Sequence, residues 1–525
     1  MAKEKDVKIE SVKQHYIPYP IKDELIGMNM KRLETDVVIF GGGTAGLAAA
    51  VTAAERGARV IVLEKSSVTG GTGNRGMGPL GVESRIQRWK KIPPTKEEAF
   101  KAFMDFTLWR VDARLVSEYI RRSGETIDWL ESMGVEFADV IRYFTRRGYA
   151  THHVVKPPDR PPGPGASAVI MERLTEKAKE LGVQIYLQTE VKRILKEDGR
   201  IVGVIAQSKE GEEIEVRAKA VIIATGGFGD NPEMIKNYTK YEWGKTIFSM
   251  RIPGMRGDGI RLAWEVGAAR DVMTMEAAGL TLASTRPGEV PIGGPIMTLN
   301  RVFTQPTNLM VDVLGERCVN EEVEGAFLAN AVFRLKDSCI FSIFDDKTRE
   351  KYETEGFEWG SWPWPFERPK ELGKMLEEEA KRGELAVFVA NSLEELAEKC
   401  GIKKDTFLKT VKEYNATCEK GYDEVFFKNS RYLWPIKKPP FYAGKLVIGG
   451  YGSLGGIKIN YKCEVLDENW EPIPGLYAAG VDACSIYHDT YVFILPGNTM
   501  GFALTSGRIA GENAVNYIKK LNAER

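Results

Sequence analysis

Residues 36–64 read DVVIFGGGTAGLAAAVTAAERGARVIVLE, and the order of apolar and glycine-rich pieces in this stretch indicates the fold. The apolar run at 37–40 predicts a buried parallel strand, and the alanine-rich run after the glycines predicts a helix. Residues 59–63 predict a second strand that ends at Glu64. A strand, a helix and a strand in this order form a βαβ unit, so we expect an α/β protein.

The glycines of this unit, Gly41, Gly43 and Gly46, have the G-x-G-x-x-G spacing of a dinucleotide-binding turn. The first allows a tight turn, the second lets a pyrophosphate approach the backbone, and the third lets the helix pack close to the sheet. The helix N-terminus offers N–H groups and a positive dipole to phosphates. Glu64, 18 residues after Gly46, is placed to accept hydrogen bonds from a ribose. A glycine-rich turn without a ligand is the alternative interpretation.

The composition is that of a globular protein large enough for two or more domains, with 525 residues, 43% hydrophobic and 28% charged. The formal net charge is zero, which predicts no general attraction to nucleic acid or to an anionic membrane. No apolar run is long enough for a membrane span, and the charged segment MAKEKDVKIESVK lacks the apolar core of a signal peptide. We therefore expect a cytoplasmic protein.

Cysteine and histidine are too scattered to predict a metal site. None of the six cysteines lies two or three residues from another, which excludes the usual iron–sulfur and haem-attachment motifs. With only four histidines, a zinc or di-iron site is not expected either. The prediction is therefore no bound metal and reduced cysteines.

Changes in composition divide the chain into four segments. Residues 1–34 are polar and predict an N-terminal arm, and residues 35–272 contain the βαβ unit and further strands. Residues 273–452 hold much of the tryptophan and proline and show little βαβ pattern, so we expect a separate α+β capping domain there. Residues 453–525 return to the glycine-rich strand–turn–helix pattern and complete the first domain.

Two local predictions bear on the region between the turn and the capping domain. Residues 95–133 have apolar residues at helical spacing, so we expect helix there. Residues 142–165, which include the run YFTRRGYATHHVVKPPDRPPGPG, are rich in Pro, Gly and Arg and predict a long irregular connection.

Five motifs follow one another in the order of the FAD-dependent fumarate reductase and succinate dehydrogenase flavoprotein superfamily, which includes the 3-ketosteroid dehydrogenases. The chain resembles this superfamily at GGGTAGLAAA (41–50), EKSSVTGGTGNRGMG (64–78), ATGGFGDN (224–231), GMRGDGIRLAWEVGA (254–268), and IPGLYAAG (473–480) with PGNTMGFALTSGRIAGENA (496–514). VDVLGERCVNE (311–321) resembles a further motif of its capping domain. The resemblance implies a Rossmann-like, glutathione-reductase-type FAD-binding domain with an inserted α+β capping domain.

The resemblance also implies FAD in the glycine site, bound non-covalently, because residues 68–78 lack the histidine that attaches FAD in some members. Val481 stands where members of the superfamily often carry an acidic flavin contact. The cofactor-binding residues it implies are Gly41, Gly43, Thr44, Ala45, Gly46, Glu64, Lys65, Gly70, Gly71, Thr72, Asn74, Met77, Gly78, Val191, Ala224, Thr225, Gly226, Gly227, Asp258, Gly480, Val481, Asn498, Thr499 and Met500.

The resemblance argues against fumarate or succinate as the substrate. Members that reduce fumarate carry cationic or histidine side chains at positions that hold Thr304, Ile494 and Gly452 here. A dicarboxylate needs fixed cations to offset the loss of its hydration. We therefore expect a less charged substrate.

The 3-ketosteroid dehydrogenases resemble the chain at PGNTMG, where Gly497 falls on a glycine whose N–H polarises a substrate carbonyl. Their tyrosine position holds Phe493, and tyrosines on the same loop are candidates to replace it. Each candidate also has a purely structural interpretation, as a packed tyrosine, a solvated histidine or an ion-paired arginine. The candidate catalytic residues are Tyr491, Tyr487, His488, Arg301 and Gly497.

Together these features predict an FAD-dependent oxidoreductase that acts on a carbon–carbon bond next to a carbonyl or carboxyl group. Its partners would be a small-molecule substrate and a separate electron-carrying chain or diffusible carrier. Two alternatives stay open at this point: an oxidase or dehydrogenase of another substrate class, and the flavin subunit of a multi-chain electron-transfer complex.

Overall fold

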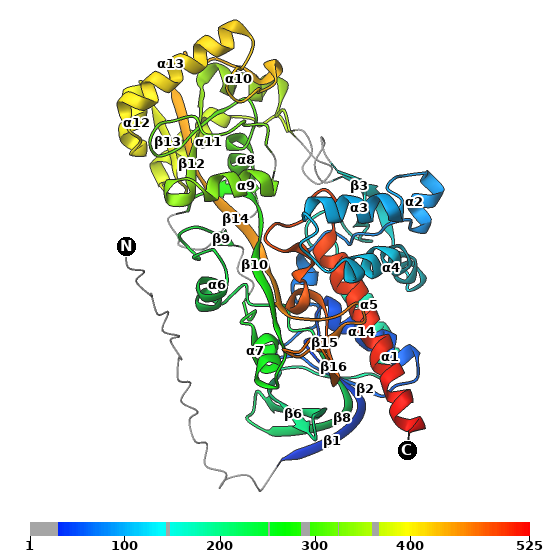
Figure 1. The fold of residues 1–525 in the computed structure, drawn as a ribbon. Coiled ribbons are helices and arrows are strands. Elements are labelled where there is room, and N and C mark those ends of the chain that lie inside the picture. The colour runs from blue at the N-terminus through cyan, green and yellow to red at the C-terminus, as the bar shows by residue number, and fades with distance from the viewer. Residues whose placement is uncertain are drawn as a thin grey trace, which may run out of the picture.

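The computed structural model of the protein describes residues 30–142, 148–249, 253–284, 294–323, 325–359 and 367–524. In this part of the chain the strands form two large sheets and one hairpin (Figure 1). The first sheet runs in the order β15 (Glu464–Leu466), β16 (Pro472–Ala478), β8 (Glu213–Ile223), β1 (Lys31–Phe40), β2 (Val60–Leu63) and β5 (Gln184–Tyr186), with β6 (Thr189–Glu197) and β7 (Arg200–Ser208) joined to β8.

The centre of the first sheet is parallel, as the βαβ pattern predicts. β1 pairs with β2 from Val37↔Val60 to Phe40↔Leu63, and with β8 on its other side. β16 pairs in parallel with the end of β8, which brings residues 472–478 beside residues 213–223. The carboxyl ends of these strands therefore meet at one edge of the sheet, the place where doubly wound α/β folds bind ligands.

Two helices with small residues pack closely at this edge. α1 (Thr44–Glu55) is rich in alanine, and α14 (Asn498–Ala523) crosses it with glycines facing its backbone. A Cβ atom added to Gly507 or Gly511 would lie 2.3 Å from the Ala45 carbonyl oxygen or 2.5 Å from that of Ala49. Any larger residue at those two positions would push the helices apart. α5 (Ala168–Glu180) also packs against α1.

A helical layer lies beside α14 and contains α2 (Arg85–Lys90), α3 (Lys96–Phe106) and α4 (Ala113–Ser132) (Figure 1). The predicted helical stretch at 95–133 is therefore two helices, and the turn between them includes Leu108 and Trp109 at positive φ. A capping box between Thr95 and Glu98 fixes the start of α3.

The prediction of an irregular connection over 142–165 is wrong in part. Residues 152–155 form β4 (His152–Val155), which pairs with β3 (Phe137–Ile141) in a hairpin. Residues 143–147 lie outside the described part of the chain.

The second sheet belongs to the predicted capping segment. It contains β10 (Arg270–Leu282), β14 (Phe441–Ile457), β12 (Cys339–Asp345) and β11 (Leu309–Val311), with β13 (Val387–Ala390) and β9 (Phe248–Ser249) paired to β14. The long strands β10 and β14 run from the region of the first sheet up into the capping segment (Figure 1). The capping helices are α8 (Gly294–Phe303), α9 (Gly325–Phe333), α10 (Asp346–Glu355), α11 (Leu372–Arg382), α12 (Leu393–Cys400) and α13 (Lys404–Lys420).

The ends of β1, β10 and β14 define how the segments join. β1 begins at Lys31, so the last residues of the predicted arm belong to the first sheet, and residues 1–29 lie outside the described part of the chain. β10 begins at Arg270 and β14 ends at Ile457, so the second sheet extends slightly past both boundaries expected for the capping domain. α6 (Pro232–Tyr238) and α7 (Asp258–Glu265) lie between β8 and β10.

A buried charge cluster holds the capping segment together. Glu321 and Lys428 are both fully buried, with 3.3 Å between the Glu321 Oε2 and the Lys428 Nζ, and Arg317 pairs with both Glu321 and Asp423 at 2.8 Å. The Lys428 ammonium also donates to the Tyr414 hydroxyl and to a backbone carbonyl. Burial acts to raise the pKa of Glu321, but Lys428 and Arg317 hold it below its ordinary value.

We predict that Lys428→Ala lowers the free energy of unfolding of the protein by about 3–5 kcal/mol, because it leaves buried acceptors without their cation. Thermal or urea unfolding of the purified protein measures the change. Lys409→Ala is the control, since the Lys409 side chain is 74% exposed and lies 3.8 Å from Glu413. Equal stability of the two variants would contradict the prediction.

Candidate active site

The glycine-rich turn between β1 and α1 is closed on one side and open on the other. Gly41 has φ +105°, and an added Cβ would lie 2.1 Å from the Ala224 carbonyl oxygen. A Cβ on Gly46 would lie 1.8 Å from the Gly41 carbonyl oxygen, so this position also requires glycine. An added Cβ on Gly43, in contrast, would meet its first atom at 3.9 Å. The open side at Gly43 fits the approach of a pyrophosphate to the backbone.

Two helices begin at this edge without a side-chain cap. Gly43 is the N-cap of α1, and Gly497, at φ +83°, is the N-cap of α14. A helix start leaves its first N–H groups without intrahelical partners and carries partial positive charge. The two helix starts therefore fit the phosphates and the electron-rich ring edge of a flavin dinucleotide.

Glu64 lies at the end of β2 with its carboxylate fixed by the backbone. One oxygen accepts from the Gly42 N–H at 2.6 Å and the other from the Ser66 N–H at 2.7 Å. An ionised carboxylate accepts about four hydrogen bonds, so Glu64 retains capacity for ribose hydroxyls. Lys65 and Asp258, two further predicted cofactor residues, form an ion pair with 2.6 Å between their charged atoms.

The predicted flavin loop folds across this edge. Asn74 donates from its amide to the Thr69 carbonyl at 2.9 Å and covers Gly70. The Met77 carbonyl accepts from the Val155 N–H at 2.9 Å, which joins the loop to β4. The other predicted cofactor residues border the same edge, at the starts of α1 and α14, the ends of β8 and β16, and in β6 and the loop itself: Thr44, Ala45, Gly71, Thr72, Gly78, Val191, Ala224, Gly480, Asn498, Thr499 and Met500.

Asp482 is a residue of this edge that the sequence analysis missed. Its fully buried carboxylate accepts from the N–H groups of Thr225, Gly226 and Gly227, at 3.1 Å for Gly226 and 2.9 Å for Gly227. Burial raises the pKa of Asp482, although these hydrogen bonds act in the opposite direction. An acidic residue thus follows Val481 directly, and it fixes the turn after β8. Its position beside Val481 was the available signal.

The two tyrosines of the loop before α14 both reach the start of that helix. The Tyr487 hydroxyl donates to the Asn498 side-chain oxygen at 3.2 Å, and the Tyr491 hydroxyl accepts from the Thr499 N–H at 3.0 Å. Burial raises the pKa of both phenols well above the ordinary value. Because Tyr491 uses its oxygen as an acceptor there, its own proton is available for donation.

The remaining catalytic candidates are held in other ways. The His488 side chain is 25% exposed, and its Nδ1 lies 3.5 Å from the Asp489 carboxylate. Arg301, in α8, pairs with Glu367 at 2.8 Å, and burial lowers its pKa. The Gly497 carbonyl accepts from the Leu80 N–H at 2.7 Å, so Gly497 joins the start of α14 to the flavin loop. The structure therefore brings Tyr487, Tyr491 and Gly497 together and places Arg301 in the capping segment.

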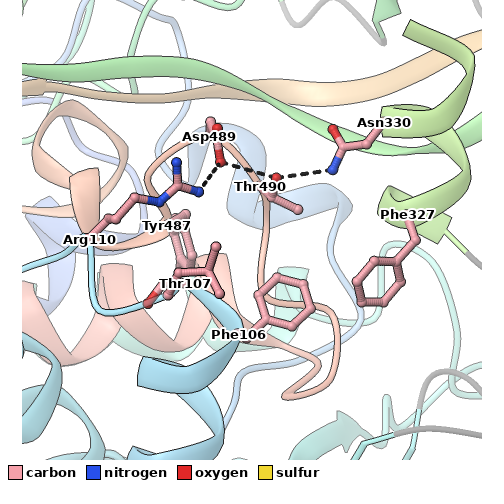
Figure 2. Close-up of a pocket in the computed structure, with 9 residues that line it drawn as sticks. Phe106, Thr107, Arg110, Phe327, Asn330, Tyr487, Asp489 and Thr490 are labelled. Atoms are coloured by element: carbon pink, nitrogen blue, oxygen red, sulfur yellow. Dashed lines mark hydrogen bonds and ion pairs between the residues drawn. The ribbon is translucent and has the colours of Figure 1, made fainter. Parts of the chain in front are cut away.

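A small cavity lies between α3, α9 and the tyrosine loop (Figure 2). Its volume is about 160 Å³. The Phe106 and Phe327 rings pack against each other on one side of it (Figure 2), with 5.3 Å between their centroids. Its polar members are joined in a chain, from Arg110 to Asp489 at 3.2 Å and from Thr490 to Asn330 at 3.1 Å. The lining residues are Phe106, Thr107, Leu108, Arg110, Phe327, Asn330, Tyr487, Asp489 and Thr490.

Glu276, in β10, is the second residue that the sequence analysis missed. It is 9% exposed, and its carboxylate accepts from the Thr499 hydroxyl at 3.1 Å. Burial raises the pKa of Glu276 to about 7, although the hydrogen bond from Thr499 acts in the opposite direction. A glutamate inside a strand carries no sequence signal that distinguishes it from a surface residue.

Residues 36–499 match the FAD binding domain family. The chain belongs to the FAD binding domain family. It is an FAD-dependent oxidoreductase, which confirms the cofactor, the fold class and the superfamily expected from the motifs. Across the described residues, no group of three or more His, Cys, Asp or Glu side chains is arranged to hold a metal ion. No helix in that part of the chain combines the length and apolar character that crossing a membrane requires.

Individual relatives resemble nearly the whole chain. A vinyl phenol reductase from Lactiplantibacillus plantarum is 34% identical over 92% of this chain and 96% of its own. An NADH:fumarate oxidoreductase from Klebsiella pneumoniae is 28% identical over 91% of this chain. The match covers about half (47%) of that longer relative. A solved 3-ketosteroid-Δ4-(5α)-dehydrogenase from Rhodococcus jostii, in complex with 4-androstene-3,17-dione, is 25% identical with a TM-score of 0.71, covering 93% of this chain and 100% of its own.

We predict that the purified protein is yellow and releases intact FAD when it is denatured by acid or heat. The segment 68–78 that lies along the cofactor edge contains no histidine for covalent attachment. Absorbance of the supernatant after precipitation measures the release. Flavin that stays with the precipitated protein would contradict non-covalent binding.

We predict that Glu64→Ala weakens FAD binding roughly 10- to 150-fold, which corresponds to the 1.5–3 kcal/mol of a hydrogen bond to a charged group. Fluorescence titration of the apoprotein with FAD measures the dissociation constant. Glu190→Ala is a matched control, because Glu190 is an exposed partner of Lys192. Equal affinity of wild type and Glu64→Ala would show that Glu64 does not bind the ribose.

Proposed function

We propose that this protein reduces an activated carbon–carbon double bond in a small molecule that carries about one aromatic ring and no carboxylate. The observation that carries this proposal is the cavity beside the tyrosine loop. FAD bound at this site would, once reduced, supply the hydride that carries both electrons of such a reaction.

The size of the cavity favours a single ring. An apolar cavity of about 150 Å³ accommodates benzene, and the cavity here is about 160 Å³ with the rings of Phe106, Phe327 and Tyr487 on its walls. Aromatic walls bind a planar ring through offset or edge-to-face contacts. The vinyl phenol reductase relative, whose named substrate has one ring and one vinyl group, supports this choice.

The charges around the cavity favour a substrate without a carboxylate. The Arg110 guanidinium is paired with Asp489, a carboxylate that also interacts with Lys240. Thr304 donates its hydroxyl to backbone carbonyls of its own helix, and Ile494 contributes its carbonyl to the Tyr149 N–H. Neither position supplies a cation that would offset the desolvation of a carboxylate. These features support the expectation that fumarate and succinate are poor substrates.

The chain contributes three actions to the proposed reaction. Tyr491 donates its hydroxyl proton to the carbon that does not receive the hydride. The N–H of Gly497 hydrogen-bonds the carbonyl or phenolic oxygen that activates the double bond. The start of α14 supplies partial positive charge at the edge where negative charge develops. The electrons come from a separate protein or a diffusible carrier.

We predict that a vinyl phenol and a single-ring enone reoxidise the reduced holoenzyme faster than about 1 per second, the low end of ordinary turnover numbers. The enzyme is reduced with dithionite under anaerobic conditions, and the return of flavin absorbance is followed by stopped flow. Fumarate and acrylate are the charged comparison compounds. Rapid reoxidation by fumarate, with none by the neutral compounds, would overturn the proposed substrate class.

Asp489→Asn provides a control for the charge argument. It removes the carboxylate that compensates Arg110 while it preserves the shape of the side chain. We expect this variant to increase the rate with a single-ring carboxylate, such as cinnamate, relative to the rate with vinyl phenol. An unchanged ratio would show that Arg110 does not face the substrate.

A further inference from the structure

Glu276 is directed to the start of α14 by an irregularity in the second sheet. Met275 pairs with Ser453 and Ala277 pairs with Gly450, so two residues of β14, at 451 and 452, lie opposite the single residue Glu276. Bulges of this kind redirect side chains and are frequent next to active sites. The bulge includes Gly452, the position at which members of the resembled superfamily that reduce fumarate carry a histidine.

Thr499 links this carboxylate to the tyrosine loop. Its hydroxyl donates to the Glu276 Oε1 at 3.1 Å. The Thr499 N–H donates to the Tyr491 phenol oxygen at 3.0 Å. The Thr499 side chain also interacts with this phenol and acts to lower its pKa, against the effect of burial. One threonine at the helix start therefore contacts a carboxyl group on one side and a phenol on the other.

Among the described residues, the titratable groups that interact electrostatically with Glu276 include no cation. These groups are Cys484 beside β14 and Tyr487 and Tyr491 on the loop, all neutral at pH 7. The Cys484 thiol is itself engaged with the Gly455 N–H and the Val481 carbonyl. A carboxyl group in such a setting gains and loses its proton near neutral pH.

We infer that Glu276, Thr499 and Tyr491 form a proton relay that supplies the proton for reduction of the substrate double bond. The inference rests on the proposed function and extends it to the origin of the proton. Glu276 and Thr499 are positioning and proton-storing residues, and of the three only Tyr491 passes a proton to the substrate. The Tyr491 ring packs on Tyr487, which lines the cavity, with 5.0 Å between the ring centroids.

The reduction adds one hydrogen to each end of the double bond, and the relay supplies one of them as a proton. One carbon receives a hydride, with two electrons, that originates from the external reductant and is delivered by the bound cofactor. The other carbon takes the Tyr491 hydroxyl proton. The Tyr491 oxygen recovers a proton from the Thr499 hydroxyl, and that hydroxyl recovers one from the Glu276 carboxyl group. Glu276 then takes a proton from solvent. Because burial disfavours a Tyr491 phenolate, transfer from Glu276 must accompany transfer to the substrate.

The relay predicts a specific pH dependence. Glu276 must be protonated to supply the proton, so wild-type turnover is constant below pH 7 and falls about tenfold per pH unit above it. Glu276→Gln lowers turnover on the order of tenfold or more and removes this fall between pH 6 and pH 8. Tyr491→Phe lowers turnover on the order of 100-fold. Steady-state rates with vinyl phenol as oxidant of the reduced holoenzyme measure all three.

Two further variants separate the relay from a structural effect. Thr499→Val removes the bridging hydroxyl and is expected to behave like Glu276→Gln, whereas Thr499→Ser restores the rate and the pH profile. Glu215→Gln is the matched control, because Glu215 is also a buried strand glutamate, at 7% exposure, but it pairs with Arg32 and Arg217 rather than with Thr499. The FAD dissociation constant of every variant shows whether the cofactor is still bound normally.

Infrared spectroscopy tests the protonation of Glu276 independently of turnover. In the holoenzyme we expect a carboxylic acid carbonyl band that titrates near pH 7, is absent in Glu276→Gln and is retained in Glu215→Gln. A wild-type enzyme that reduces no double bond would overturn the proposed function. An active enzyme whose rate and pH profile are unchanged in Glu276→Gln, or one without the titrating band, would overturn the relay alone.

Discussion

The close packing of α1 on α14 is the constraint on which the rest of the site depends. Because Gly507 and Gly511 let the α1 backbone approach within a distance that excludes a Cβ atom, the two helices start at one edge of the parallel sheet. Both starts lack side-chain caps. An edge with two uncapped helix starts concentrates N–H groups and positive dipole, which suits a ligand that carries a pyrophosphate at one end and an electron-accepting ring at the other.

The polar groups buried at this edge follow from the same geometry. The turn after β8 has three consecutive N–H groups that neighbouring strands do not use, and the Asp482 carboxylate accepts from all three. At the start of α14, Asn498 accepts from two tyrosine hydroxyls. Thr499 in the next position donates to Glu276 and Tyr491. A buried polar group without a partner is costly, so these networks fix the loop before α14 in one arrangement.

The capping segment reaches this edge through β10 and β14. A buried Glu321–Lys428 pair joins two loops of this segment, one before α9 and one after α13. The capping segment contributes only two of the residues that line the cavity, Phe327 and Asn330 of α9. They face Phe106 and Thr490 (Figure 2). The size and charge of the cavity therefore depend on how the capping segment and the first domain meet.

The sequence by itself determined the Rossmann-like fold, the FAD site and the family, because glycine spacing and strand–helix order are local and encode the backbone geometry that a dinucleotide requires. It also predicted that Tyr487 and Tyr491 lie at this edge, since both fall between two motifs that must end there, and both hydroxyls do reach the start of α14. It missed β4, because a short strand in a Pro-rich connection has no periodic pattern. Only the tertiary structure placed Asp482, Glu276 and the cavity, and moved Arg301 into an ion pair with Glu367. Those features join residues that are 66 to 379 positions apart, and partners at such separations are chosen by packing rather than by any local pattern.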